Sequence, residues 1–412
     1  MLPSLNEVIV GARAEIGARG EVTVLYLSFG RFAKLEKVYG WEKLDAVLET
    51  AQGAVVDRLR ELRSANGPHL LRAATVIPHD EDVVCLDIPR ASGAGVAIKV
   101  EADVARLARG LQAAVAGRVE AMHGAEVASL VDVFIGRSHV MVDPKQRVER
   151  LIYRGVREAA AAARNVAQRD RARQLAQLRA SLRDRAVYIE YDPIVVAETG
   201  TVFGYEALAR GVVRTLRNPE VMFSLAAEGN LHWELSRLCR AKAYEGMHDR
   251  LRPDQLLFVN ADPLDFADPE FANVTGVLRG ASGAAEESHD PHQVVIEITE
   301  RTAITDYPTM REQMRAFREL GYRFAVDDAG SGYSGLGSIA NLEPDFIKLD
   351  MSLIAGIDGN AVKQNLVETM VRFANEQSTR VIAEGVERAE ELATLQDLGV
   401  HLVQGYFVNR AK

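Results

Sequence analysis

The sequence predicts an α/β protein with two domains, a small α/β domain and a C-terminal (β/α) barrel, joined by a long helix. A chain of 412 residues is too long for one ordinary hydrophobic core. Short apolar strands alternate with helical stretches in the C-terminal half, which indicates parallel strands with crossover helices. We place the domains at 1–146 and 186–412, with the linker helix at 147–185.

In the N-terminal segment, runs rich in β-branched residues predict strands at 22–29, 81–88 and 131–136. Apolar residues at helical spacing predict helices at 43–62 and 104–122. These elements fit a small sheet with packing helices.

The linker segment 148–186 is rich in alanine and arginine and contains no proline. Leu175, Leu178 and Leu182 mark one narrow apolar stripe, which suits pairing with a second copy of the helix or packing on its own domain. The arginines are better explained as a solvated face than as a nucleic-acid site.

The C-terminal segment carries short apolar strands separated by helical stretches. Its length approaches the ~250 residues typical of a closed barrel. The strands are expected at 256–260, 294–298, 323–327, 346–350, 380–384 and 401–405, with helices that include 309–320 and 360–377.

Composition narrows the functional classes. The net charge of −9 argues against a general DNA-binding protein. Cys85 and Cys239 lie far apart without metal-site spacing, which fits reduced thiols in the cytoplasm. Neither a signal pattern nor an apolar run of ~18 residues is present, so we expect a cytoplasmic protein without membrane insertion.

Polar side chains that carry an oxygen ligand or an ammonium group follow the strands of the C-terminal half. They are Glu206, Asn260, Glu297 with Glu300, Asp327 with Asp328, Lys348, Glu384 with Glu387, and Gln404. Because the C-terminal ends of parallel barrel strands meet on one face, these residues should form one cluster. Taken singly, each has an ordinary explanation as a turn former, a helix cap or a surface charge. Their recurrence at every strand end favours a joint site.

So many carboxylates would repel one another without cations. Carboxylate and amide oxygens suit Mg²⁺ or Mn²⁺, and the number of acids suggests two ions. We expect Asp327 to bridge the two ions and the neighbouring Asp328 to bind the second ion. Two-ion sites cleave phosphate esters. Lys348 could orient the attacking hydroxide or neutralise phosphate charge.

These residues also carry a family resemblance. "YEALAR" (205–210) resembles the signature of the EAL domain family, phosphodiesterases of the bacterial second messenger cyclic di-GMP. Further blocks follow in the family's order over 186–409: "EITE", "DDAGSGYSGL", "IKLD", "AEGVE" and "QGYFV". The resemblance implies hydrolysis of cyclic di-GMP to linear pGpG by a barrel with one antiparallel strand.

The resemblance implies a role for each matching residue. Metal ligation falls to Glu206, Asn260, Glu297, Asp327 and Asp328, with Glu387 supporting the second ion. Glu384 would act as general base and Lys348 would position the hydroxide. Arg210 would hold a substrate phosphate, Gln404 would line the site, and Glu300 would anchor the loop after Asp328.

Two departures from the family pattern bear on turnover. Ala329 stands where the family has Phe after the paired aspartates, in a loop that links catalysis to dimerisation. Asp192 in "YDPI" replaces a glutamine near the substrate. Neither departure removes a metal ligand.

The segment 24–48 resembles the opening of GGDEF domains, which are diguanylate cyclases. Pro78 and His79 replace two glycines of the signature before Asp80 and Glu81, and Ser28 replaces a metal-binding aspartate. The resemblance implies a degenerate, non-cyclising regulatory domain that binds a nucleotide or a protein partner, or assists dimerisation.

Three functions follow from these observations. The first is a metal-dependent cyclic di-GMP phosphodiesterase, regulated by its N-terminal domain and forming a homodimer. The second is a catalytically weak receptor that binds cyclic di-GMP and signals to a protein partner. The third is a scaffold without nucleotide chemistry.

Overall fold

The computed structural model describes residues 3–29, 32–62, 69–77, 81–87, 94–247, 249–272, 290–298, 304, 306–329, 339, 341–405 and 407. The chain divides into two compact units, Met1–Ala176 and Gln177–Lys412.

The first unit contains a four-stranded antiparallel sheet in the order β2-β3-β1-β4. Its strands are β1 Glu21–Ser28, β2 His69–Ile77, β3 Glu81–Asp87 and β4 Phe134–Met141. The expected strand at 131–136 therefore begins only at Phe134, and β2 adds a strand that the sequence analysis did not identify. Pro78, His79 and Asp80 lie outside the described residues.

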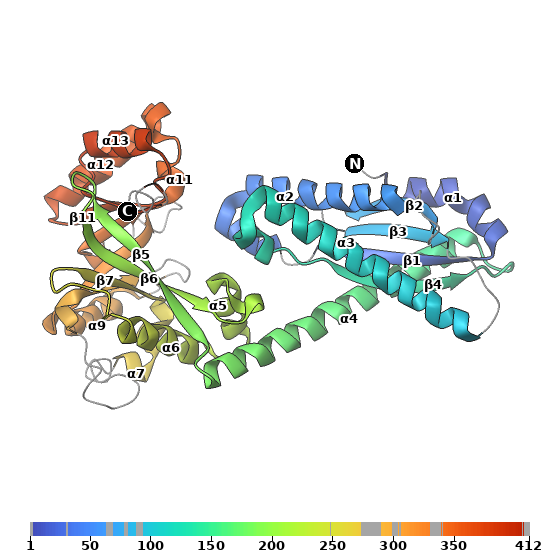
Figure 1. Cartoon of the computed structure of the whole chain (residues 1–412), viewed down its shortest axis with the longest axis horizontal. Coiled ribbons are helices and arrows are strands. Elements are labelled where there is room, and N and C mark those ends of the chain that lie inside the picture. Colours follow the sequence, from blue (N-terminus) through green and yellow to red (C-terminus); the bar gives the residue numbers. More distant parts are fainter. Residues whose placement is uncertain are drawn as a thin grey trace. The chain divides into compact units, whose positions relative to one another are not determined.

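Helices cover both faces of this sheet. They are α1 Leu5–Arg19, α2 Phe32–Leu62, α3 Ala94–Ser129 and α4 Val148–Arg183. Ile9 and Ile16 of α1 join Leu151 and Ile152 of α4 in one core with Val24 of β1. Helices α2 and α3 pack against one another beside the sheet (Figure 1).

Helix α4 confirms the expected long helix as one continuous element. Its first half crosses β4 at very short range. A Cβ on Gly136 would lie 1.9 Å from the Ala159 carbonyl oxygen, and one on Gly155 would lie 2.3 Å from Val140 Cγ2. Glycine at both positions allows helix and strand backbones to approach closely. No helix among the described segments is long and apolar enough to cross a membrane.

The second unit contains a closed eight-stranded barrel in the order β10-β11-β12-β5-β6-β7-β8-β9 (Figure 1). Its strands are β5 Val187–Val196, β6 Val202–Gly211, β7 Leu256–Ala261, β8 Val294–Ile298, β9 Arg323–Ala329, β10 Phe346–Leu349, β11 Arg380–Ala383 and β12 Leu402–Val403. Strand β5 is antiparallel to both of its neighbours, and the other pairs are parallel. The expected barrel with one reversed strand is confirmed.

Helices surround this barrel. The α-helices are α5 Pro219–Glu228, α6 His232–Glu245, α7 Pro269–Ala272, α9 Tyr307–Glu319, α11 Met351–Ile354, α12 Ala361–Glu376 and α13 Ala389–Asp397. Short 3-10 turns are η1 Arg214–Leu216, η2 Pro263–Ala267, η4 Pro291–Gln293 and η5 Ile357–Gly359. Outward strand residues such as Leu257 and Val326 pack with helix residues such as Met314 and Phe317.

A smaller core fills the barrel interior. Its buried residues are Ile194, Leu256, Phe258, Val295, Ala325, Phe346, Ile382 and Leu402. Because side chains alternate along a strand, a residue two positions beyond any of these also faces inward. This alternation places polar residues at the next inward-facing positions, directly above the inner core.

Candidate active site

A polar layer lies directly above the inner core of the barrel. In six parallel strands or their direct extensions, the polar residue stands two positions after an inner core residue. The pairs are Phe258 and Asn260, Val295 and Glu297, Ala325 and Asp327, Phe346 and Lys348, Ile382 and Glu384, and Leu402 and Gln404. Asp192 stands two positions before Ile194, and because β5 is reversed it extends toward the same end, opposite Glu206 of β6.

Lys348 stands at the centre of this layer and is fully buried. Its Nζ lies 2.5 Å from Glu297 Oε1 and 2.5 Å from Glu384 Oε1. The same nitrogen lies 3.1 Å from Glu206 Oε2 and 3.6 Å from Asp327 Oδ1. One ammonium therefore faces four carboxylates from four different strands.

Two amide side chains complete the hydrogen bonding of Glu206. Asn260 Nδ2 donates to Glu206 Oε1 at 3.2 Å, and Gln404 Nε2 donates to Glu206 Oε2 at 2.8 Å. Gln404 Nε2 also donates to Asp192 Oδ2 at 2.6 Å. The departure from glutamine to Asp192 thus places a further carboxylate in contact with the cluster.

Burial and neighbouring charges shift the pKa values of these groups in opposite directions. Burial tends to raise the pKa of Glu206, but Lys348, Gln404 and Asn260 outweigh burial and hold it below its usual value. Burial, together with the charge of Glu206, raises the pKa of Glu297 well above its usual value.

Glu384 and Lys348 are shifted as well. Burial raises the pKa of Glu384 to about 8, against the opposing effect of Lys348. For Lys348, burial favours the neutral amine, but the four surrounding carboxylates raise its pKa well above the usual value. Lys348 therefore stays charged, but its single positive charge cannot neutralise the four carboxylates around it.

The arrangement suits a hard divalent cation. Glu206, Glu297 and Glu384 each offer one oxygen, and these oxygens lie within 4.8 Å of one another. Three buried acceptors of this cluster have no hydrogen-bond partner among the described residues: Glu297 Oε2, Asp327 Oδ1 and Gln404 Oε1. Buried oxygens without donors are costly in a folded protein unless a cation or water satisfies them. The donor set is all oxygen, which matches Mg²⁺ or Mn²⁺.

Several predicted site residues stand apart from this cluster. Glu387 is exposed and does not belong to the three-carboxylate group. Asp328 belongs to β9 by its backbone, but its side chain lies outside the described residues, as does all of Glu300. Ala329 ends β9.

Arg210 lies four residues beyond Glu206 on β6 and is engaged with a carboxylate. Its Nε donates to Glu190 Oε2 at 2.8 Å. The sequence analysis did not identify Glu190. Strand alternation places Glu190, Asp192 and Ile194 on one face, but the partner of Glu190 depends on the register of β5 against β6.

Comparisons with known proteins concern the second unit. Residues 175–411 match the family model described as the EAL domain. An Escherichia coli K12 protein named "Probable cyclic di-GMP phosphodiesterase PdeB" is 28% identical over 239 residues, which are 57% of this chain and 44% of that protein. Cyclic di-GMP phosphodiesterase NbdA of Pseudomonas aeruginosa is 30% identical over 244 residues, 57% of this chain and 30% of that protein.

A solved structure described as "PaMucR Phosphodiesterase, c-di-GMP complex" superposes with a TM-score of 0.51 at 27% identity, covering 57% of this chain and 96% of that one. The chain spans less than half the length of each of these two curated relatives.

Proposed function

The chain belongs to the EAL domain family, and from this premise we propose that its barrel hydrolyses cyclic di-GMP to linear pGpG in a metal-dependent reaction. Two relatives carry the name cyclic di-GMP phosphodiesterase, and a similar solved structure is a cyclic di-GMP complex. The reaction would take place in the cytoplasm.

One observation carries this proposal. Carboxylates from β6, β8 and the end of β11 converge within 4.8 Å, and buried oxygens beside them have no hydrogen-bond donor. Such oxygens are costly to bury unless a cation or a water satisfies them. A site that must accept cations and a substrate leaves acceptors unpaired.

The proposed metal ligands are Glu206, Asn260, Glu297, Asp327 and Asp328, with Glu387 supporting a second ion. Two bound ions would acidify a water and stabilise negative charge on the reacting phosphate. Glu387 is exposed in this structure, so its role requires a change of side-chain position or a bridging water.

Glu384 is proposed as the general base. Without metal, burial raises its pKa to about 8, so near neutral pH only a minor ionised fraction can take a proton from water, and bound cations would favour that ionised form. Lys348 holds Glu384 through the 2.5 Å contact and keeps positive charge beside the reacting phosphate.

Arg210 is proposed to bind a substrate phosphate, and Gln404 and Asp192 to line the pocket. Glu190 now holds Arg210 Nε, so phosphate would compete with this carboxylate or bind the remaining guanidinium nitrogens. Because Gln404 contacts both Asp192 and Glu206, substrate contacts and metal ligands are linked by one amide.

The first unit is proposed to regulate the barrel as a degenerate GGDEF-like domain, with a nucleotide or protein partner, in a homodimer. Its small α/β architecture supports this proposal, but the signature region 78–80 lies outside the described residues.

The direct test is incubation of the purified chain with cyclic di-GMP and Mg²⁺ or Mn²⁺, followed by chromatography for pGpG. We expect product with metal and none after chelation. Glu206→Ala should abolish turnover, because Glu206 contacts Lys348, Asn260 and Gln404 at once. Glu198→Ala, an exposed acid in the β5–β6 turn, is the matched control.

Other outcomes would identify the other functions. Tight binding of cyclic di-GMP without pGpG would indicate a receptor, and neither binding nor product would indicate a scaffold. Full turnover by folded Glu206→Ala would contradict the proposed ligand set.

A further inference from the structure

The loop after β11 carries Glu384, and a buried carboxylate outside the proposed site holds this loop. Glu391 of α13 is almost fully buried. Its Oε2 accepts from the backbone N–H of Glu387 at 3.0 Å and of Arg388 at 3.1 Å. The bond from Arg388 is an ordinary cap of α13, but the bond from Glu387 lies outside the helix.

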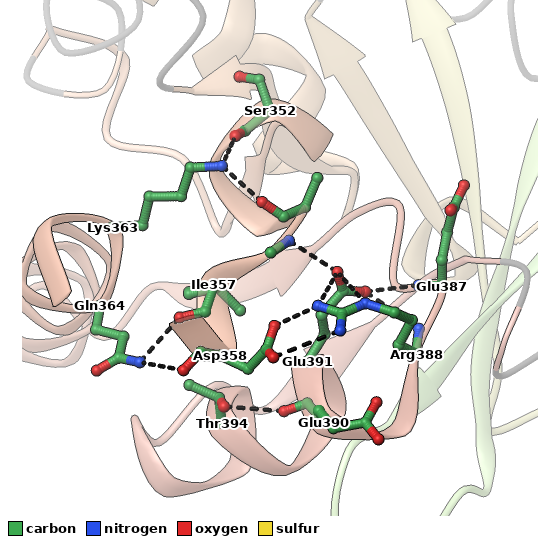
Figure 2. Close-up of polar contacts among 12 residues, drawn as sticks. Ser352, Ile357, Asp358, Lys363, Gln364, Glu387, Arg388, Glu390, Glu391 and Thr394 are labelled. Carbon is green, nitrogen blue, oxygen red and sulfur yellow. Dashed lines mark hydrogen bonds and ion pairs between the residues drawn. The ribbon is translucent and has the colours of Figure 1, made fainter. Parts of the chain in front are cut away.

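The other oxygen of Glu391 reaches a different loop. Gly356 N–H, in the segment that follows β10 and α11, donates to Glu391 Oε1 at 2.8 Å. Arg388 Nε and Nη2 contact the same oxygen at 3.2 and 3.1 Å, and Nη2 also binds Asp358 (Figure 2). One carboxylate therefore joins the loop after β10 to the loop after β11.

The loop after β10 is itself fixed to α12. Lys363 Nζ donates to the carbonyl oxygens of Ser352 at 2.6 Å and Ala355 at 2.7 Å. Gln364 Nε2 donates to the Ile357 carbonyl oxygen at 2.8 Å (Figure 2). Glu391 thus attaches the Glu384 loop to a segment that is held in place.

The two loops also touch near the proposed site. Glu384 N–H donates to the Leu349 carbonyl oxygen at 3.1 Å. A Cβ on Gly385, whose φ is +68°, would lie 2.5 Å from Met351 Cβ. These contacts follow β10 and β11 directly, the two strands that place Lys348 and Glu384 in contact.

We propose that Glu391 is a positioning residue, which ties the loop after β10 to the loop after β11 and thereby holds Glu384 against Lys348. Its side chain contacts neither the carboxylate cluster nor the proposed substrate contacts, and it meets Glu387 only through the backbone N–H of that residue. The inference rests on the proposed function for its effect on turnover, but its effect on the loop can be measured separately.

The first experiment compares Glu391→Ala and Glu391→Gln with wild type in turnover of cyclic di-GMP. Because small displacements of catalytic groups cost up to about 100-fold in rate, we expect kcat of Glu391→Ala to fall about 10- to 100-fold. KM should change less than about twofold, since the proposed substrate contacts lie on β5, β6 and β12. Glu391→Gln keeps one acceptor oxygen and should recover part of kcat.

Two control variants distinguish a positioning role of Glu391 from the simple loss of a helix cap. Asn218→Ala removes the cap of α5, where Asn218 Oδ1 accepts from Glu220 N–H, and should lower the melting temperature comparably while leaving kcat unchanged. Glu390→Gln makes the same charge change at an exposed neighbour of Glu391 and should leave both quantities unchanged.

The second experiment does not depend on activity. It measures hydrogen exchange of the Glu384 and Val386 amides, which donate to Leu349 and Gln404 and not to Glu391. Exchange at both should accelerate in Glu391→Ala and not in Asn218→Ala. If exchange stays at the wild-type rate, Glu391 is a helix cap only and the proposal is overturned, whether or not wild type hydrolyses cyclic di-GMP. If exchange accelerates while wild type yields no pGpG, the proposed function fails alone.

Discussion

Lys348 balances four carboxylates with one charge, and this imbalance is the main physical property of the site. Glu206, Glu297, Asp327 and Glu384 all lie within 3.6 Å of its ammonium group. Without cations, part of the cluster must stay protonated, and burial together with the charge of Glu206 raises the pKa of Glu297 well above its usual value. The proposed cation binding would relieve this imbalance, at a cost in stability to the metal-free protein.

Glu297→Gln should stabilise the metal-free protein at neutral pH. A carboxyl whose pKa is raised on folding costs stability above its unfolded pKa, and the neutral amide removes this cost. The gain should grow as pH rises from the usual glutamate pKa toward 7. Thermal unfolding in a chelator should show a higher melting temperature for the variant, together with loss of pGpG formation. A lower melting temperature would contradict the charge imbalance.

Site residues were predictable where strand periodicity governs them. Six polar residues each follow an inner core residue by two positions, so a correct strand assignment brings them together. They are Asn260, Glu297, Asp327, Lys348, Glu384 and Gln404. Glu387 lies beyond the strand end, where no periodicity applies, and the structure leaves it exposed. The contact of Arg210 with Glu190 depends on the register of β5 against β6, which the sequence does not reveal.

At the scale of elements, α6 is tied to the segment after β7 by a buried ionic cluster. Asp265 of η2 accepts from Ser236 Oγ at 2.6 Å and lies 3.1 Å from Arg240 Nη1 and 3.3 Å from His232 Nε2. The negative charge of Asp262 also raises the pKa of His232, and the positive charge of Arg240 lowers it. Because β7 carries Asn260, this cluster supports one side of the proposed site.

Stability should depend on pH through His232. Its contact with Asp265 raises the pKa of the imidazole despite burial. The stability that this ion pair contributes is therefore fully present below the unfolded histidine pKa of about 6.5, and it is lost as pH rises through the higher pKa of the folded state. Urea unfolding of wild type against His232→Gln should differ by about 1–2 kcal/mol near pH 5.5 and less near pH 8.5. An equal difference at both pH values would exclude the ion pair, and His401→Gln, at an exposed position, serves as control.

The crossing of β4 and α4 should tolerate no side chain at Gly136. A Cβ there would lie 1.9 Å from the Ala159 carbonyl oxygen and 2.3 Å from the Ala163 nitrogen, both backbone atoms. We expect Gly136→Ala to destabilise the first unit by about 3 kcal/mol or more. Gly117→Ala, in an exposed turn of α3 with no atom within 4 Å, should instead stabilise by about 0.5–1 kcal/mol. Denaturant titration measures both, and similar values for the two variants would contradict the packing.

Elements with a clear apolar or compositional pattern were predictable, and two elements without one were not, although neither is short. Helix α4 was expected from its alanine content and the absence of proline, and it is present within a few residues. Helix α1 and strand β2 were not identified. α1 mixes glycine with valine and shows little apolar periodicity, and its Ser4–Glu7 capping box was the available signal. β2 runs "HLLRAATVI", where Arg72 and two alanines interrupt the β-branched pattern.

At the scale of the whole molecule, the chain has separate hydrophobic cores. One core joins α1, β1, β4 and α4, and others lie inside and around the barrel. The two-unit organisation was predictable from length and from the change in pattern near α4. The GGDEF-like assignment of the first unit stays a prediction, because Pro78, His79 and Asp80 lie outside the described residues.

Separate cores predict two calorimetric transitions. Mn²⁺ at about 100 times its Kd should raise only the barrel transition, by about 5–10 °C, because all of its proposed ligands lie in the barrel. Gly136→Ala should lower only the other transition. Movement of both transitions together in either experiment would show that the units unfold as one.

The reversed direction of β5 has a practical use. Because β5 and β6 form a hairpin, their turn at Glu198–Gly200 is exposed at the end of the barrel away from the carboxylate layer. Val196 and Thr201 close this turn by backbone hydrogen bonding, so its base is fixed while its tip is exposed. A fluorescent protein inserted after Thr199 would sit on the same two strands that carry Asp192 and Glu206. Such a fusion could report ligand occupancy in living cells without obstructing the mouth of the barrel.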